Sequence, residues 1–451
     1  MPADKNLGYA AAGSATLATM SGLLSEFAPL AYIEAVTNES PFISSGALKE
    51  IPQDGKEIVV EVETGVSGNT QFQVDYGARA IGGTAQPAVA RYIPATITDS
   101  LSLGQNAVKG KMKDDEMSTL IDVKLGIIMK NAARFLSQGI FGLAQNPQAA
   151  ATWSSTAAGG TVTVPFLSVE WAKPGMTVDF CDLSSSKSYV VRIADVTSAA
   201  VGGNSANVAG TVTFENVVLN PATLSVVVLT DTAVAVGDTI RLRGTTAGFG
   251  GSSAVVAGNA INSFDAICGS GANAAFAGID PATTPGWKGT TLALGGVYTQ
   301  DAMVQFAAQL RRQGGSMFSH AVMSPSLAAN HAVSASFGTY GASALAPVAG
   351  SRVKQLDASY DKYGNVHDSG LKLLGKPVII DPNLVSTSIL LHNDKNAYLA
   401  IWKEMGVDEE DGNGTFINRQ NYSTDTFFSG SQQLIVGNRA SLGMVTGITG
   451  L

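Results

Sequence analysis

The chain has 451 residues, enough for two or three domains with a large core, and its 36 acidic and 28 basic residues give a formal net charge of −8. This balance excludes a general affinity for nucleic acid, which needs a basic face. Its two cysteines, Cys181 and Cys268, are far apart and outside any ligand spacing, which excludes a disulfide framework and a zinc site. Gly, Ser, Thr and Pro break the longest uncharged runs, so neither a signal peptide nor a membrane span is expected.

The low content of charged residues says more about function. Charged residues make up 14% of the chain, where about 25% is typical. Residues 313–351 contain no Asp, Glu, Lys or Arg. A solvated monomer normally covers itself with more charge, so this composition favours a subunit of a large homo-assembly whose apolar surface is covered by other copies. The alternative is an enzyme with a core rich in Gly and Ala.

Residues 1–50 are expected to form an N-terminal arm. A helical pattern of Leu17, Met20, Leu24 and Phe27 is interrupted by Pro29, after which a second short helix can start. The segment has little core of its own. We therefore expect it either to fray or to lie along a neighbouring chain.

Residues 51–104 are expected to form an extended two-stranded loop. Residues 56–63 end in a strand-like alternation, and residues 92–103 are predicted as its partner strand despite Pro94. The connection at 64–91 is far too long for a tight turn. A projecting two-stranded arm has no core beneath it, so contact with another subunit is expected to order it. The alternative is an ordinary surface loop.

Residues 105–158 are expected to hold a spine helix and part of a peripheral domain. Apolar residues at three-then-four spacing predict one helix over residues 114–141, with carboxylates at its start. At ~1.5 Å per residue it would reach roughly 40 Å. The predicted core-facing residues are Met117, Ile121, Leu125, Ile128 and Phe135.

Residues 159–258 predict an inserted all-β domain, a barrel or a sandwich, because short strands alternate with turn residues and helical patterning resumes afterwards. The expected strands are 161–164, 176–181, 189–196, 211–219, 224–229 and 239–243.

Residues 259–451 predict an α+β domain. A helix over 299–313 has Thr299 as its cap, Arg311 and Arg312 in its last turn, and glycines at its end. Further strands are expected at 321–323, 378–380, 388–391, 398–402, 434–436 and 444–448.

The sequence predicts no catalytic, cofactor-binding or metal-binding constellation. The nearest phosphate-loop match ends in Lys376 and Pro377, and Pro377 stands where Ser or Thr is needed. Ser184 and Lys187 have a nucleophile spacing but lie in an expected turn. The four histidines are scattered, and the acidic run at 408–411 fails the calcium-loop spacing.

The order of these parts resembles the major capsid protein of tailed double-stranded-DNA bacteriophages, the Hong Kong 97-type fold. The phrases most similar to phage capsid sequences are FAGIDPATTPGW at 276–287, AVMSP at 321–325 and NRASLGMVTGI at 438–448. The resemblance covers about three quarters of the chain, and residues 159–258 look like the β-domain that some such proteins insert. It implies a peripheral and an axial domain, with residues 259–451 supplying the axial domain and the remainder of the peripheral one.

The resemblance implies a structural rather than an enzymatic role. Copies would form hexamers and pentamers that close into an icosahedral shell around viral double-stranded DNA. The shell would be part of the virion and would be assembled in the host cytoplasm. The family's long N-terminal scaffolding extension is not found, which implies a separate scaffolding protein. A portal, a decoration protein and weak contact with packaged DNA are the other implied partners, and no membrane is implied.

Lys109, Lys111 and Lys113 form the densest basic group and are candidate inner-surface residues of such a shell, the alternative being solvated lysines before a helix. Two rival functions stay open. One is a tail or decoration protein of a virion. The other is a β-rich carbohydrate-active enzyme, which would need two carboxylates in a groove. The carboxylates available to it are Asp179, Asp182, Asp195, Glu215 and Asp238.

Overall fold

The computed structural model describes most of the chain after its first 27 residues. The arm before residue 28, the expected strand at 224–229 and the three lysines at 109, 111 and 113 lie outside the described residues. The described residues are 28, 31–33, 35–36, 39–63, 87–104, 114–155, 159–182, 187–198, 209–215, 233–236, 238–242, 260–328, 331, 359–360, 366–368, 371–385, 387–408, 415–418 and 423–450.

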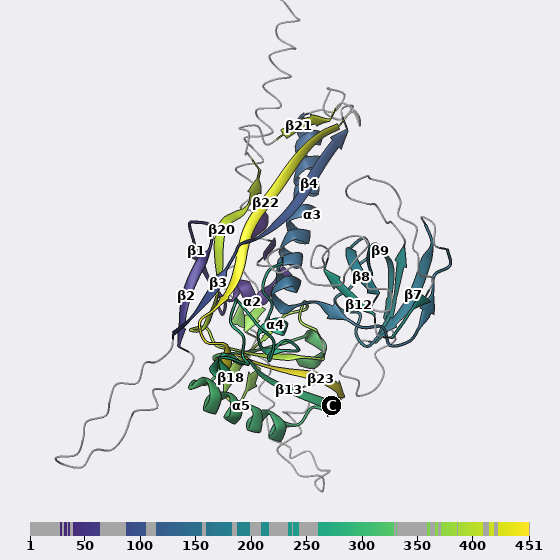
Figure 1. Ribbon diagram of the computed structural model, residues 1–451. Coiled ribbons are helices and arrows are strands. Elements are labelled where there is room, and N and C mark those ends of the chain that lie inside the picture. The colour runs from purple at the N-terminus through teal and green to yellow at the C-terminus, as the bar shows by residue number, and fades with distance from the viewer. Residues whose placement is uncertain are drawn as a thin grey trace, which may run out of the picture.

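The chain is rich in sheet and has few helices in its described part, as expected of an α+β fold. Its first described elements are α2 (Pro41–Ser44) and β1 (Lys49–Pro52). An antiparallel hairpin follows, made of β2 (Ile58–Glu63) and β3 (Pro87–Tyr92), and it projects from the body of the molecule (Figure 1).

The structure contains the predicted hairpin, but the prediction of its second strand was wrong. β3 falls inside the stretch expected to be connection, and the residues expected to pair with 56–63 form most of a separate strand, β4 (Ala95–Gly104). β4 pairs instead with β22 (Ser423–Val436), near the other end of the chain. Pro94 explains the break, because it cannot donate to a ladder and separates the two strands.

The spine helix α3 (Asp114–Phe141) has the predicted bounds. It ends at Gly142, whose φ of 82° suits a glycine after a helix. Leu125 and Ile128 are buried, and Phe135 is half-buried. The side chains of Met117 and Ile121 lie outside the described residues.

The spine helix lies beside a five-stranded sheet with the order β1-β20-β22-β21, in which β4 also pairs with β22 (Figure 1). β1 runs parallel to β20, and the other pairs are antiparallel. β20 and β22 are much longer than the predicted strands at 398–402 and 434–436, because only those parts show a clear strand pattern in the sequence. The remaining bounds are β20 (Ala397–Val407) and β21 (Thr415–Asn418).

A second, six-stranded sheet has the order β5-β12-β8-β9-β10-β7 and a hydrophobic core of its own. It begins before residue 159, since β5 pairs with β12. A small pair, β11 and β6, joins the same core through Val234. The bounds are β5 (Ala144–Gln145), β6 (Ala151–Thr152), β7 (Thr161–Phe166), β8 (Thr177–Asp182), β9 (Lys187–Ser198), β10 (Gly210–Glu215), β11 (Ala233–Val234) and β12 (Thr239–Leu242).

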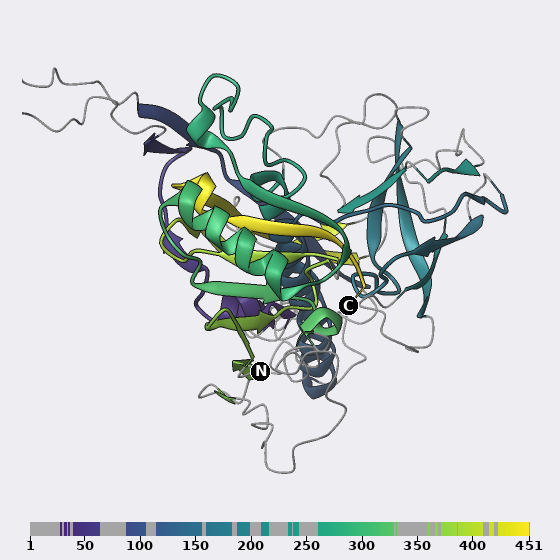
Figure 2. The same cartoon turned by 90° about the horizontal axis from the view of Figure 1, so that it is seen from below.

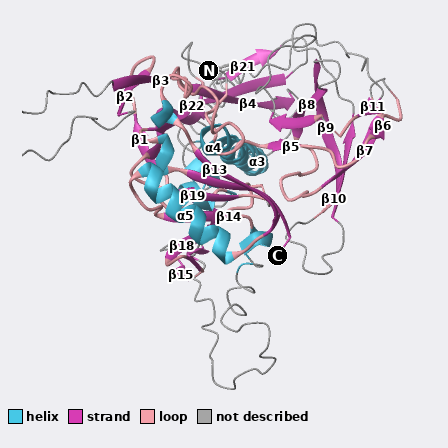
Figure 3. Ribbon diagram, turned by 60° about the horizontal axis from the view of Figure 1, so that its bottom comes forward, coloured by secondary structure: helices cyan, strands magenta, loops and turns pink. Residues whose placement is uncertain are grey.

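A third sheet, β13-β23-β19-β14-β18-β17, carries α5 (Gln300–Gly314) across one face and packs its other face toward α4 (Phe264–Cys268) (Figure 3). Thr299 caps α5 by accepting from the Ala302 N–H, as predicted. The strands are β13 (Thr290–Val297), β14 (His320–Met323), β17 (Lys372–Leu373), β18 (Lys376–Ile380), β19 (Ile389–His392) and β23 (Gly443–Gly450).

Other short elements are η2 (Pro285–Trp287), η3 (Arg439–Ser441) and the paired strands β15 (Ser359–Tyr360) and β16 (Val366–Asp368). None of the described helices is both long and apolar enough to cross a bilayer. The hairpin and the second sheet lie on opposite sides of the body in two views (Figures 1 and 2).

Part of the charge-free run lies in the core rather than on a covered surface. Phe318, Val322 and Met323 are fully buried, and Met317 is exposed. Within the described residues of this run, its lack of charge is therefore explained mainly by burial inside the subunit.

Candidate assembly surfaces

The hairpin of β2 and β3 has one anchored face and one free face. Val62, Ala90 and Tyr92 are buried against the body, whereas Val59 is 51% and Val89 43% exposed. This alternation follows from the strand period of two. Isolated two-stranded hairpins are at best marginally stable in water, so the free face is a candidate contact surface.

Hydrogen bonds fix the base of the hairpin. The Tyr92 hydroxyl donates to the Val436 carbonyl at 2.8 Å and accepts from the Val436 N–H at 3.3 Å. The Arg91 N–H donates to the Ala277 carbonyl at 3.0 Å. The strands therefore leave the body in a set direction.

The spine helix has an exposed apolar stripe opposite its buried face. Val123 is 57% and Ile127 55% exposed, and they lie four residues apart on one side of the helix. The sequence predicted a single inward stripe and missed this one. A signal was present, since Val123 and Ile127 are apolar positions outside the predicted stripe.

Ile127 belongs to the wall of a groove of about 1280 Å³. The spine helix forms one wall, and β4 forms a second with six consecutive residues, 95–100. The inserted domain contributes residues 173–177 and 241–242, and Phe427 of β22, 46% exposed, contributes a ring. β4 pairs only with β22 among the described strands, so its other edge is open.

Four side chains in this groove hold buried polar atoms that have no hydrogen-bond partner among the described residues. Two are donors, the Nε atoms of Arg134 and Arg241, and two are acceptors, the Oε1 atoms of Gln138 and Gln432. Buried polar groups are normally paired, so these atoms need a partner outside the described residues. Sequence reasoning could not find them, because they come from three separate parts of the chain.

Ion pairs and burial set the electrostatics of the groove. Arg134 on α3 pairs with Glu39 of the N-terminal segment at 2.8 Å. On the β4 side, burial raises the pKa of Asp99, partly offset by the hydrogen bond it accepts from the Ser100 N–H. The groove thus offers cationic donors on its helix and inserted-domain walls and an acidic side chain on its β4 wall.

Direct hydrogen bonds tie the inserted domain to the rest of the subunit. The Gln138 amide donates to the Trp171 carbonyl at 3.0 Å, and the Ser326 hydroxyl donates to a Glu170 carboxylate oxygen at 3.1 Å. Phe135 of the spine also packs against the inserted domain's core. The predicted core residue Phe135 therefore faces the inserted domain rather than the main core.

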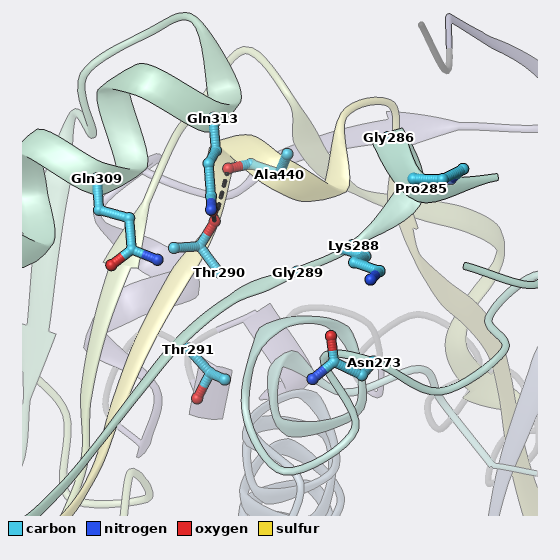
Figure 4. Close-up of a pocket in the computed structure, with 10 residues that line it drawn as sticks. All are labelled: Asn273, Pro285, Gly286, Lys288, Gly289, Thr290, Thr291, Gln309, Gln313 and Ala440. Atoms are coloured by element: carbon cyan, nitrogen blue, oxygen red, sulfur yellow. Dashed lines mark hydrogen bonds between the residues drawn. The ribbon is translucent and has the colours of Figure 1, made fainter. Parts of the chain in front are cut away.

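A smaller cavity of about 380 Å³ lies where β13, α5 and η3 meet (Figure 4). The Thr290 hydroxyl lies 2.9 Å from Gln313 Oε1 and 3.1 Å from the Ala440 carbonyl oxygen, and it can donate its one proton to either. The lining residues include the single cation Lys288 and no carboxylate, imidazole or thiol. This cavity therefore offers hydrogen bonds without an acid–base pair.

Four of the five carboxylates considered for a glycosidase have described side chains, and these four differ in burial and partners. Asp179 and Asp238 are buried, Asp195 is exposed, and Glu215 pairs with Arg192 on the sheet surface. The Asp238 carboxylate accepts from the Ala235 N–H at 2.7 Å. No cluster of three or more His, Cys, Asp or Glu that could hold a metal occurs among the described residues.

No protein-family model matches the chain, and no curated protein matches it. Among solved structures it is similar to the cyanophage A-1(L) capsid asymmetric unit, at 13% identity over 91% of this chain and 93% of that chain, with a TM-score of 0.43. It is also similar to the capsid of an empty GTA particle, at 9% identity over 91% of each chain and a TM-score of 0.40.

A third similar structure is the satellite phage P4 procapsid with its size determination protein, at 9% identity over 92% of this chain and 98% of that chain, and a TM-score of 0.37. Over about nine tenths of its length the chain is thus similar to capsid structures, at identities that assign no role to individual residues.

Proposed function

We propose that this chain is the major capsid protein of a tailed double-stranded-DNA bacteriophage, a structural protein whose copies assemble into a closed shell. The observation that carries the proposal is the projecting hairpin of β2 and β3, whose base is fixed by hydrogen bonds while Val59 and Val89 face solvent. Val59 and Val89 are not covered by the described part of the subunit. In a shell, a neighbouring copy covers them.

The groove beside the spine helix has the features of the matching surface. Its open β4 edge accepts the backbone of an added strand, Ile127 and Phe427 offer apolar contact, and the unpaired donors and acceptors need partners. On the hairpin, Glu61 shares the free face with Val59. Its carboxylate can accept a hydrogen bond from Arg241 in the groove of the neighbouring copy. The hairpin projects on the side of the body opposite the inserted domain, so the contact would join two copies (Figures 1 and 2).

Hexamers and pentamers, an icosahedral shell and enclosed DNA belong to the same proposal. So do the virion location, the assembly in the host cytoplasm and the domain limits expected from the sequence, with two changes: the extended loop ends before β4, and the inserted domain takes in β5 and β6. A separate scaffolding protein, a portal and a decoration protein are its proposed partners. Lys109, Lys111 and Lys113 are its proposed inner-surface residues, where modest positive charge allows weak, reversible contact with phosphate.

Purified full-length protein tests the proposal directly. Sedimentation velocity is expected to show species of many subunits, and negative-stain images are expected to show closed shells or capsomer-sized rings. Tubes or discrete trimers would favour a tail or decoration protein instead. A monomer that stays monodisperse at high concentration, with or without added scaffolding protein, would overturn the proposal.

A further inference from the structure

The third sheet has one end that is rich in positive charge. Its strands β13, β23, β14 and β18 run parallel and begin at this end, and the antiparallel β19 finishes there. The last turn of α5 lies at the same end, where Gln313 contacts Thr290 of β13 at 2.9 Å. The cations of this basic end are Lys288, Arg311, Arg312, Lys372, Lys376 and Lys395.

Carboxylates are scarce at the basic end. Asp394 is the single acidic residue in the connections that meet there, and none of the six cations forms an ion pair within the described residues. At the opposite end, the described connections contain no Lys or Arg, and Asp301 and Asp381 lie there. The connections of the basic end are residues 286–289, 315–319, 374–375, 393–396 and 437–442.

Hydrogen bonds hold these connections together. The Asp394 N–H donates to Ser319 Oγ at 3.0 Å, and the Asn393 amide donates to Ser316 Oγ at 2.7 Å. They join the segment that carries Lys395 to the connection that follows α5. Burial lowers the pKa of His320, Asp394 raises it and Lys376 lowers it, so both charged side chains act on the first residue of β14.

Helix stability explains only part of this charge. Arg311 and Arg312 stand in the last turn of α5, where positive charge offsets the helix dipole. Lys288, Lys372 and Lys395 are exposed and belong to other elements, so the dipole does not account for them. Exposed cations without acidic neighbours raise the local concentration of an anionic partner.

The cavity of about 380 Å³ opens at the basic end (Figure 4). Lys288 lines it together with the amides of Asn273 and Gln309 and the hydroxyl of Thr291, and no carboxylate is among its lining residues. Neutral donors beside a cation are the groups that proteins use to contact phosphate oxygens. The cavity therefore has the chemistry of a phosphate subsite within a wider basic surface.

We propose that the basic end of the third sheet binds the phosphate backbone of double-stranded DNA. The choice of DNA as the polyanion rests on the proposed function. Six strands at a spacing of ~4.8 Å span roughly 24 Å, a length over which one DNA strand presents about seven phosphates at ~3.4 Å each. Because backbone contacts carry no sequence information, binding is expected to be independent of DNA sequence.

Fluorescence anisotropy of a labelled random-sequence duplex of about 30 base pairs tests the proposal on the full chain across a salt series. The protein is kept at concentrations at which sedimentation shows unassembled subunits. The triple variant Lys372→Gln, Lys376→Gln and Lys395→Gln is expected to bind on the order of tenfold or more weaker than wild type. Its slope of log affinity against log salt is expected to fall by about three. Lys395→Gln alone is expected to lower the slope by about one, and it decides if the triple variant does not fold.

The matched control removes the same charge elsewhere, through Lys49→Gln, Lys56→Gln and Lys130→Gln, all of which are exposed lysines. It is expected to stay within about threefold of wild type. A wild-type chain that does not bind the duplex at low salt, an unchanged slope in the Lys395→Gln protein, or an equal loss in the control would overturn the proposal. Unchanged DNA binding with loss of large species in sedimentation would also overturn it, and would assign the basic end to another copy. Since the DNA readout uses unassembled subunits, it is separate from whether shells form.

Discussion

The guanidinium of Arg439 lies over the ring of Phe276, with its Cζ atom 5.2 Å from the ring centroid. Arg439 is completely buried, and every acceptor that the structure shows for it is a backbone carbonyl. A single side chain thus joins η3 to the end of α4 and to η2. The accepting carbonyls are those of Ala266, Ile267, Gly271, Ala274 and Trp287.

Arg439→Lys is expected to lower the free energy of unfolding by on the order of 3 kcal/mol, because an ammonium cannot reach all these carbonyls and leaves buried acceptors unpaired. Urea denaturation measures the change. Arg192→Lys, at an exposed pair with Glu215, is the control and is expected to cost less than about 1 kcal/mol. An Arg439→Lys protein as stable as this control would show that the carbonyl network contributes little.

The free face of the hairpin is expected to matter for assembly and not for folding. Val59→Glu combined with Val89→Glu is expected to leave the urea midpoint nearly unchanged, because both side chains are exposed, while sedimentation shows loss of large species. Val236→Glu, at an exposed turn of the inserted domain, is the matched control and is expected to assemble. Normal assembly of the double variant would remove the hairpin from the interface.

The groove makes a separate prediction about the spine helix. Ile127→Lys places a charge in the groove and is expected to block assembly in a folded subunit, whereas Val123→Lys, one turn earlier and outside the groove lining, is expected to have a much weaker effect. Sedimentation velocity at matched concentrations compares the two. Equal effects would mean that the exposed stripe acts as a whole and that the groove has no special part.

The inserted domain is expected to respond to a core change as a unit. Trp153 is buried in its core, with its ring 6.5 Å from that of Phe180, so Trp153→Ala is expected to cost about 3 to 5 kcal/mol there. Hydrogen exchange is expected to increase in β8 and β9 and to stay unchanged in α5. An equal increase in α5 would mean that the second sheet is not an independent unit.

Local patterns predicted the elements better than they predicted the pairing. The spine helix has a long stripe and acidic start, and the helix over Gln300–Gly314 has its cap and basic end, so both were found with close bounds. β13 was missed because its paired glycines, Gly295 and Gly296, interrupt the alternation. β3 was missed because Pro87, Ala88 and Ala90 give little strand signal.

The surfaces could be predicted only in part. A projecting hairpin was expected from the sequence, and its contact with another subunit, inferred from the absence of a core beneath it, stays a prediction. The groove could not follow from the sequence, because its walls are Ile127, Phe427 and the open edge of β4, which only the tertiary fold brings together. The contacts of Ser40 with Ser137 and Asp381 have the same origin, since the three residues are remote in sequence.

A symmetric reconstruction of the assembled particle by electron cryomicroscopy tests the capsid proposal most directly. The expected result is a closed icosahedral shell in which Val59 and Val89 of one copy are covered by the groove of a neighbour, against Ile127 and Phe427. A particle without closed symmetry, or a shell in which the hairpin face stays in solvent, would contradict it.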